Sequence, residues 1–256
     1  MDGMRRMLSF VRRAVDEYEM IEEGDRVAVG LSGGKDSIAL MLTLAELRKF
    51  YPKQFELIAL TVDMGREGVD FSPLQALCEK AEVPYEIIPS DIAHVVFDVR
   101  KESNPCSLCA KLRRGNLNTA AVARGCNKVA LGHHFDDAVE TFMLNLFHEG
   151  RIGCFRPVTY LDRTGITVIR PLLYAKEKDV RYFARKNDLP VVDSLCPANG
   201  NTERERIKNL LADLERGDKG LKHRIFGAMQ RAGIDGYGIA QNTAPACDET
   251  AESERE

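Results

Sequence analysis

Residues 26–42 read RVAVGLSGGKDSIALML: an apolar run, a turn with two glycines, a lysine and two serines, and a second apolar run. The first run has the length and composition of a buried strand, and the second those of a helix. Glycines let the backbone approach an anion closely, and the free N–H groups of a helix N-terminus attract negative charge. The stretch therefore predicts a phosphate-binding turn between a strand at 26–31 and a helix at 37–50.

The spacing of this turn differs from a Walker A loop, in which a hydroxyl residue directly follows the lysine. Here Asp36 follows Lys35, and the hydroxyl of Ser37 comes one place later. A plain turn with an exposed lysine is the alternative, but it would not need two serines and an aspartate as well. The expected phosphate ligands are Ser32, Gly33, Gly34, Lys35 and Ser37, and Asp36 is the expected Mg²⁺ ligand.

The rest of the chain alternates between strand and helix patterns. Further strands are expected at 56–62, 85–88, 128–131 and 166–169, with helices at 73–81, 108–124 and 136–147. This order predicts an α/β fold with a doubly wound, mainly parallel sheet flanked by helices. Beyond residue 150 the sequence predicts a loop, a helix at 177–188, a short strand at 190–192, and helices at 202–215 and 221–232.

Four segments follow from this pattern: an N-terminal helical segment at 1–24, the main domain at 25–200, C-terminal helices at 201–237 and a disordered acidic tail at 238–256. The net charge of the 256 residues is -3, so any nucleic acid would have to bind local basic patches. No signal-peptide core or run of about 18 apolar residues is seen. We therefore expect a cytoplasmic protein without a membrane contact, whose seven cysteines are reduced.

Two polar segments follow other expected strands. Asp63 and Met64 come after the strand at 56–62, where a carboxylate suits the ribose or base of a nucleotide. The segment GHHFDD at 132–137 follows the strand at 128–131 and opens a helix. Because parallel strands end at the same edge of a sheet, both segments should lie near the phosphate turn. A helix cap with two solvated histidines is the structural alternative for GHHFDD.

Cys106 and Cys109 form a CxxC pair, which is compatible with zinc, a redox dithiol, an iron–sulfur cluster or chance. The local sequence leaves this choice open, although zinc would want a second such pair. Cys154 lies in the arginine-rich loop and is a weaker candidate for a cluster or catalytic role. We interpret Cys78, Cys126 and Cys247 as structural residues, and Cys196 is considered below.

SGGKDS resembles the PP-loop of the N-type ATP pyrophosphatases, which split ATP between the α- and β-phosphates. Together with PCSLCAKLRRG, GHHFDD, IRPLLYAKEKD and SLCPANG, it resembles the tRNA 2-thiocytidine synthetase family, TtcA, over nearly the whole chain. The resemblance implies a [4Fe–4S] cluster on Cys106, Cys109 and Cys196, with one iron left open. It also implies Mg-ATP, adenylation of the C2 oxygen of cytidine 32 in tRNA, and sulfur from a cysteine desulfurase.

The same resemblance assigns roles to single residues. Lys35, Asp36 and Asp137 would be catalytic, and the ATP site would also include Asp63, Met64, Gly132 and His133. Pro197 follows Cys196, where the family often has glycine, and the loop at 150–160 also differs. The resemblance therefore leaves the modified base open.

Basic residues near the CxxC pair and in the following loop are candidates for phosphate contacts with tRNA, although ordinary solvated charges are the alternative. They are Lys111, Arg113, Arg114, Arg151 and Arg156. A homodimer is compatible with the sequence. The rival functions are thiolation of another base such as uridine, a PP-loop tRNA ligase without sulfur chemistry, and a metal-stabilised RNA-binding protein without turnover.

Overall fold

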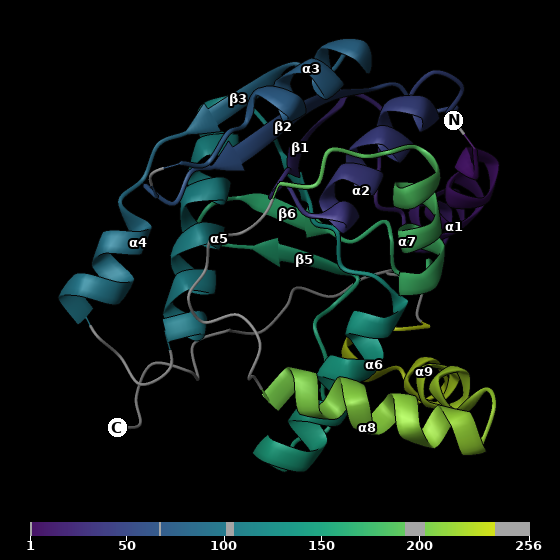
Figure 1. Cartoon of the computed structure of the whole chain (residues 1–256). Coiled ribbons are helices and arrows are strands. Elements are labelled where there is room, and N and C mark those ends of the chain that lie inside the picture. The colour runs from purple at the N-terminus through teal and green to yellow at the C-terminus, as the bar shows by residue number, and fades with distance from the viewer. Residues whose placement is uncertain (1, 67, 101–104, 193–202, 239–256) are drawn as a thin grey trace.

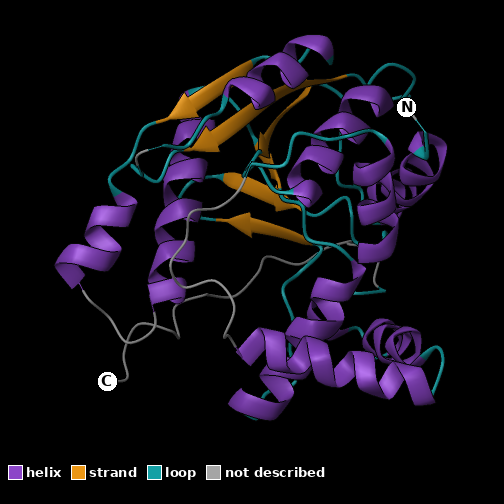
Figure 2. Cartoon of the chain, viewed as in Figure 1, coloured by secondary structure: helices purple, strands orange, loops and turns teal. Residues whose placement is uncertain are grey.

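The computed structural model describes residues 2–66, 68–100, 105–192 and 203–238. Its centre is a six-stranded sheet in the order β3-β2-β1-β4-β6-β5 (Figure 2). β1 (Asp25–Gly30), β2 (Phe55–Val62), β3 (Tyr85–Ile88), β4 (Lys128–Ala130) and β6 (Ile166–Ile169) are parallel, and β5 (Val158–Leu161) pairs antiparallel with β6. The expected α/β class and mainly parallel sheet are confirmed.

β1 and β4 are direct neighbours, with Val29 paired to Ala130. Because both strands run the same way, the turn after β1 and the GHHFDD segment after β4 leave the sheet at one edge. β2 is the neighbour of β1 on its other side, with Leu60 paired to Gly30. The carboxyl edge thus brings together the three polar segments that the sequence singled out.

Alternate residues of β1 enter two separate cores, as the two-residue period of a strand requires. Val27 and Val29 pack in the larger core, and Ala28 packs in the smaller one. α2 (Lys35–Leu47), α3 (Ser72–Lys80) and α7 (Glu177–Lys186) cover the first face. α5 (Pro105–Ala123) covers the second through Leu117 and Ala121 (Figure 1).

Helices at both ends of the chain complete the larger core. α1 (Met4–Glu17) buries one apolar face, including Met7 and Val11. α8 (Glu203–Gly217) and α9 (Leu221–Arg231) lie against α6 (Phe135–Leu144), as Figure 1 shows, and bury Leu211 and Phe226. Short elements are α4 (Ile92–His94), the π-helical turns Val95–Arg100 and Asn145–Glu149, and the 3₁₀ turn Ile234–Gly236. The division into four segments stays a prediction.

Two sequence expectations about strands are wrong. Residues 190–192 form no strand: Pro190 has no N–H, and the N–H of Val192 donates to the carbonyl of Gly33 in the turn after β1 (3.0 Å). The segment after residue 150 is not all loop, because Val158–Leu161 forms β5.

The helix expected at 136–147 is α-helical only to Leu144. No helix in the described part of the chain is long and apolar enough to cross a membrane.

Candidate active site

The side chain of Ser37 holds the turn after β1 in shape. Its hydroxyl accepts hydrogen bonds from the N–H and hydroxyl of Ser32 (3.1 Å each) and donates to the carbonyl of Gly34 (2.9 Å). Ser37 is buried, so this hydroxyl is used inside the turn. The turn is therefore formed before any anion binds, and α2 begins at Lys35 with its first N–H groups facing the turn.

Two positions near the turn leave no room for a side chain and therefore require glycine. Gly33 has φ +83, and a Cβ added there would lie 2.9 Å from the Cβ of Val192. A Cβ on Gly132 would lie 3.0 Å from the backbone carbon of Asp36. The second contact presses the GHHFDD segment directly against the first turn of α2.

Lys35 and Asp36 form an ion pair at the mouth of the turn, with 2.9 Å between Nζ and Oδ2. The other carboxylate oxygen of Asp36, Oδ1, is buried and has no hydrogen-bond partner among the described residues. Nε2 of His134 lies 3.7 Å from this oxygen. A buried carboxylate oxygen without a partner is the ligand type that Mg²⁺ prefers, so Asp36 fits the expected metal role.

Glu177, the first residue of α7, joins this pair. Its carboxylate lies 3.5 Å from Nζ of Lys35 and also pairs with Arg181 (2.9 Å) and Lys208 (3.1 Å). Burial alone would raise the pKa of Glu177, but hydrogen bonds from Lys208 and Arg181 outweigh it and lower the pKa to about 2. The carboxylate therefore stays charged near neutral pH and holds the ammonium of Lys35 in place.

The GHHFDD segment caps α6 and also contacts α8. His134 is the N-cap of α6: its Nδ1 accepts from the N–H of Asp137 (3.3 Å), and the Asp137 carboxylate accepts from the N–H of His134 (2.9 Å). The other oxygen of Asp137 pairs with Arg204 of α8 (3.3 Å). His134 thus caps the helix, as the structural alternative expected, but it is buried and not solvated, and both oxygens of Asp137 have partners within the fold.

Asp136 anchors the C-terminal helices to this edge. It is buried, accepts from the N–H of Glu177 (2.7 Å) and pairs with Lys222 of α9 (2.8 Å). Burial opposes its ionisation, but the hydrogen bonds from Lys222 and the Glu177 backbone are stronger and lower its pKa. Asp136 therefore holds α7 and α9 against this edge of the sheet.

His133, the other histidine of the segment, packs against an aromatic ring. Its ring centroid is 4.9 Å from that of Phe155, and the Arg170 guanidinium lies 4.9 Å from the same Phe155 ring. Burial, followed by the charges of Arg170, Arg204, His134 and Arg114, lowers the pKa of His133 well below its usual value. The imidazole is therefore neutral at physiological pH.

The CxxC pair opens α5. Cys106 is exposed, Cys109 is half-buried, and the two lie about one helical turn apart at the helix N-terminus. This arrangement fits two ligands of an iron–sulfur cluster. Cys196 falls in 193–202, outside the described residues. Among the described residues, no three His, Cys, Asp or Glu side chains gather into a metal site.

Cys154 has the surroundings of a structural residue. It is buried, and its Sγ donates to the carbonyl of Ala138 (3.4 Å) and lies 3.5 Å from the Tyr237 hydroxyl. Burial raises the pKa of its thiol to about 11. A thiol in this state is a poor nucleophile.

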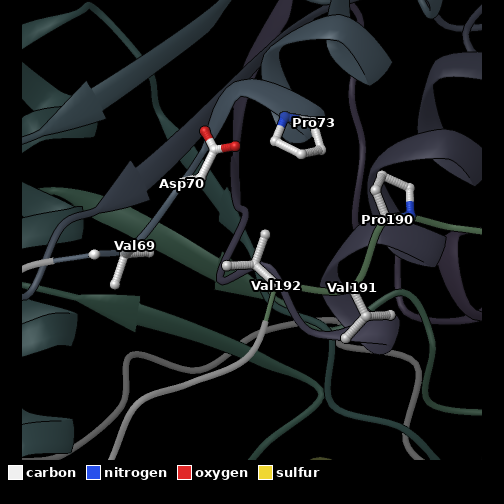
Figure 3. Close-up of a pocket in the computed structure, with 7 residues that line it drawn as sticks. Val69, Asp70, Pro73, Pro190, Val191 and Val192 are labelled. Atoms are coloured by element: carbon white, nitrogen blue, oxygen red, sulfur yellow. The ribbon is translucent and has the colours of Figure 1, made fainter.

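Asp63 and Met64 lie at the end of β2, as expected. Asp63 accepts from the N–H of Gly65 (3.0 Å), and the Met64 carbonyl accepts from the N–H of Ala93 (2.9 Å). Farther along this loop, a cavity of about 270 Å³ has apolar walls and the Asp70 carboxylate at its rim (Figure 3). Val192, which contacts Gly33, forms one wall, so the cavity borders the turn after β1.

The predicted tRNA contacts divide into two groups. Lys111, Arg113 and Arg114 are exposed on α5 after the CxxC pair. In the loop, Arg156 is exposed, and Arg151 pairs with Glu149 (3.1 Å).

Sequence reasoning missed several charged residues that tertiary packing brings to the edge: Arg170, Glu177, Arg204, Lys208 and Lys222. For Glu177 the signal was present in the EKD segment, but no role was assigned to it.

A mainly parallel sheet that ends in an SGGKDS turn, with a lysine and an aspartate that has one unpartnered oxygen at its mouth, defines the PP-loop class. The family model described as "PP-loop domain" matches residues 6–215 of this chain. The chain is 40% identical over 228 residues to the tRNA-cytidine(32) 2-sulfurtransferase of Geobacter metallireducens, covering 88% of this chain and 89% of the relative. The protein of that name from Shewanella sp. (strain W3-18-1) is 38% identical over 244 residues, covering 94% and 75%.

The U34-tRNA thiolase NcsA from Methanococcus maripaludis, solved with its [4Fe–4S] cluster, has the same fold. Its TM-score is 0.76 at 28% identity, covering 90% of this chain and 78% of that one. The chain therefore belongs to the PP-loop family and, within it, to the family of the tRNA-cytidine(32) 2-sulfurtransferases.

Proposed function

We propose that this protein is an ATP-dependent tRNA sulfurtransferase that converts cytidine 32 of tRNA to 2-thiocytidine. The observation that carries the proposal is the juxtaposition of two sites. The PP-loop turn and GHHFDD share one sheet edge, and α5, which begins with the cysteine pair, packs on the end of β1, where a Cβ added to Gly30 would lie 2.8 Å from the Leu117 side chain of α5. A base at this edge would be within reach of both ATP and the cysteine helix.

In the first half-reaction the turn binds the phosphates of ATP. The backbone of Gly33 and Gly34, the Ser32 hydroxyl and the Lys35 ammonium would contact the pyrophosphate, and Asp36 would hold Mg²⁺ through its unpartnered oxygen. Asp63, Met64 and Gly132 would line the nucleotide. The C2 oxygen of cytosine attacks the α-phosphorus, the P–O bond to the β-phosphate breaks, and pyrophosphate leaves with its charge compensated by Lys35 and Mg²⁺.

In the second half-reaction the activated oxygen leaves as part of AMP. A hydrosulfide equivalent adds at C2, the C2–O bond breaks, and the proton is released as the thiocarbonyl forms. A [4Fe–4S] cluster held by Cys106, Cys109 and Cys196 would supply the chemistry that delivers this sulfur. Asp137 and the arginines of α5 would orient the base, which must be turned out of its stack to enter the site.

The proposed partners follow from this reaction. tRNA phosphates would contact Lys111, Arg113, Arg114, Arg151 and Arg156, and a cysteine desulfurase with a thiol reductant would supply the sulfur. We also propose a cytoplasmic location. A homodimer is compatible with this function. The thiolase neighbour with its cluster favours sulfur transfer over the ligase alternative.

The cluster assignment is tested by anaerobic purification, iron analysis and absorbance spectroscopy. Serine variants of Cys106, Cys109 and Cys196 should lose iron and the thiolate-to-iron bands. Serine variants of Cys126 and Cys154, which are buried elsewhere, should retain both. Iron-free wild-type protein prepared under these conditions would contradict the assignment and revive the ligase alternative.

A further inference from the structure

The first half of α5, which carries the cysteine pair, is not packed into the body of the protein. Residues 105–116 include no buried residue, and burial on this helix begins at Leu117, which packs in the smaller core. Figure 1 shows this end of α5 extending past the strands. The core therefore does not dictate which residues stand in the first half of the helix.

Gly115 lies inside this helix without a reason that the fold supplies. It is exposed, and a Cβ added to it would have no atom within 4 Å. Its backbone is helical and not left-handed, unlike that of Gly33. Glycine inside a helix is destabilising relative to alanine, because it has more backbone freedom to lose. Neither conformation nor packing within the described chain thus requires glycine at this position.

The charges on α5 all have one sign. The helix contains Lys111, Arg113 and Arg114 and no acidic residue. None of these three cations forms an ion pair with a carboxylate of the described residues, whereas Lys208 near the phosphate turn does. Like charges without counter-charges repel one another, and a bound polyanion relieves that repulsion. The free half of α5 is therefore complementary to nucleic acid in charge.

Helical spacing arranges hydrogen-bond donors around Gly115. Lys111 lies one turn before the glycine, and Asn118 and Thr119 lie one turn after it. Arg114 directly precedes it. All four side chains carry an N–H or O–H group that can donate to a phosphate oxygen. Because Gly115 has no side chain, the middle of this group is open down to the helix backbone.

We propose that the sugar–phosphate backbone of the tRNA substrate lies against α5 at Gly115, with a phosphate between Lys111 and Arg114. The missing side chain lets the RNA backbone approach the helix closely, as glycines do elsewhere beside phosphates. Gly115 is about 9 Å along the helix axis from Cys109, so a strand held here passes the cysteine pair. This inference rests on the proposed function and goes beyond it by naming the contact that positions the substrate.

The test measures the affinity of the cluster-loaded protein for fluorescently labelled tRNA at several salt concentrations, without ATP. Gly115→Ala should melt at or above the wild-type temperature, because alanine is the better helix former, yet bind tRNA about threefold more weakly. Gly115→Leu, also compatible with a helix, should bind about tenfold more weakly or worse, because its side chain fills the place of the RNA backbone. Both variants should keep the iron content and ATP affinity of wild type.

A separate variant tests the proposed phosphate contact. Lys111→Ala should weaken binding to all tRNAs alike, because a phosphate contact carries no sequence information. It should also reduce the slope of log affinity against log salt concentration by about one. A wild-type salt slope in Lys111→Ala would overturn the phosphate contact.

Gly217→Ala and Gly217→Leu are the matched controls. Gly217 is the last residue of α8, is exposed, and likewise has no atom within 4 Å of an added Cβ. Both controls should bind tRNA as wild type does. Wild-type affinity in Gly115→Leu, or an equal loss in Gly217→Leu, would overturn the inference and leave the proposed function standing. A lower melting temperature in Gly115→Ala would also overturn it, by showing that the fold itself needs the glycine. If the wild type binds no tRNA, the proposed function fails as well.

Discussion

The ammonium of Lys35 lies 3.5 Å from the carboxylate of Glu177, so the PP-loop lysine is tied to the first turn of a helix more than 140 residues away in sequence. The same carboxylate pairs with Lys208 of α8 at 3.1 Å. Glu177 thus joins the phosphate turn to the C-terminal helices, and the site depends on elements from both ends of the PP-loop domain.

Glu177→Gln should destabilise the protein by about 2–3 kcal/mol at pH 7, somewhat less than the roughly 3.4 kcal/mol that the pKa shift from 4.5 to about 2 gives at 1.36 kcal/mol per unit, because the carboxylate is partly exposed. A lowered carboxyl pKa stabilises the folded state above pH 4.5, and this stabilisation is lost as the pH falls towards 2. The difference between variant and wild type in urea unfolding should therefore shrink below pH 4.5. Glu203→Gln, at an exposed pair with Arg206, should change stability by no more than about 0.5 kcal/mol.

Glu140 should show the opposite pH dependence. It is buried on α6, and burial, followed by the charge of Asp137, raises its pKa to about 7. A raised carboxyl pKa stabilises the folded state below about pH 4.5, and this contribution is lost as the pH rises through 7. Glu140→Gln should therefore be more stable than wild type at pH 8, by about 1–3 kcal/mol in thermal unfolding. Equal melting temperatures at pH 8, or a less stable variant there, would contradict this interpretation.

Gly33→Ala should be costly because φ is +83 and the new Cβ would meet Val192 at 2.9 Å. We expect a loss of about 2 kcal/mol or more, measured by urea unfolding. Gly34→Ala has an ordinary φ of -74 and meets only the Ser32 hydroxyl at 3.5 Å, so it should cost less than half as much. Adding Val192→Gly should recover part of the Gly33→Ala loss, and strict additivity would show that the contact is unimportant.

Lys222→Ala should remove the partner of a buried carboxylate. Asp136 would be left charged and buried, which costs about 3 kcal/mol and loosens α9. Arg224→Ala on the same helix breaks an exposed pair with Asp218 and should cost no more than about 0.5 kcal/mol. Similar losses in the two variants, measured by chemical unfolding, would argue against a special role for the Asp136 pair.

Much of the fold follows from local sequence. The parallel strands were predicted because each is a short apolar run, and the meeting of SGGKDS and GHHFDD followed from parallel strands sharing one edge. β5 was missed because it follows an Arg- and Gly-rich stretch and forms only by pairing with β6. The strand expected at 190–192 failed because the N–H of Val192 is used by Gly33.

The site could be predicted only in part, for a related reason. Lys35, Asp36 and the histidines stand in compact motifs, so their type and spacing were informative. Glu177, Arg204 and Lys222 reach the edge only because α7, α8 and α9 pack against α6 and the turn, and no local pattern encodes those contacts. The stacking of His133 on Phe155, with 4.9 Å between ring centroids, likewise exists only once the fold brings the two rings together.

The most direct measurement is nucleoside mass spectrometry of tRNA incubated anaerobically with the reconstituted protein, ATP, Mg²⁺ and sulfide. The account predicts 2-thiocytidine at position 32, with one AMP formed per thiolated base, and neither product with Lys35→Ala. Thiolation at full rate by Lys35→Ala, or a thiolated uridine in place of 2-thiocytidine, would contradict it.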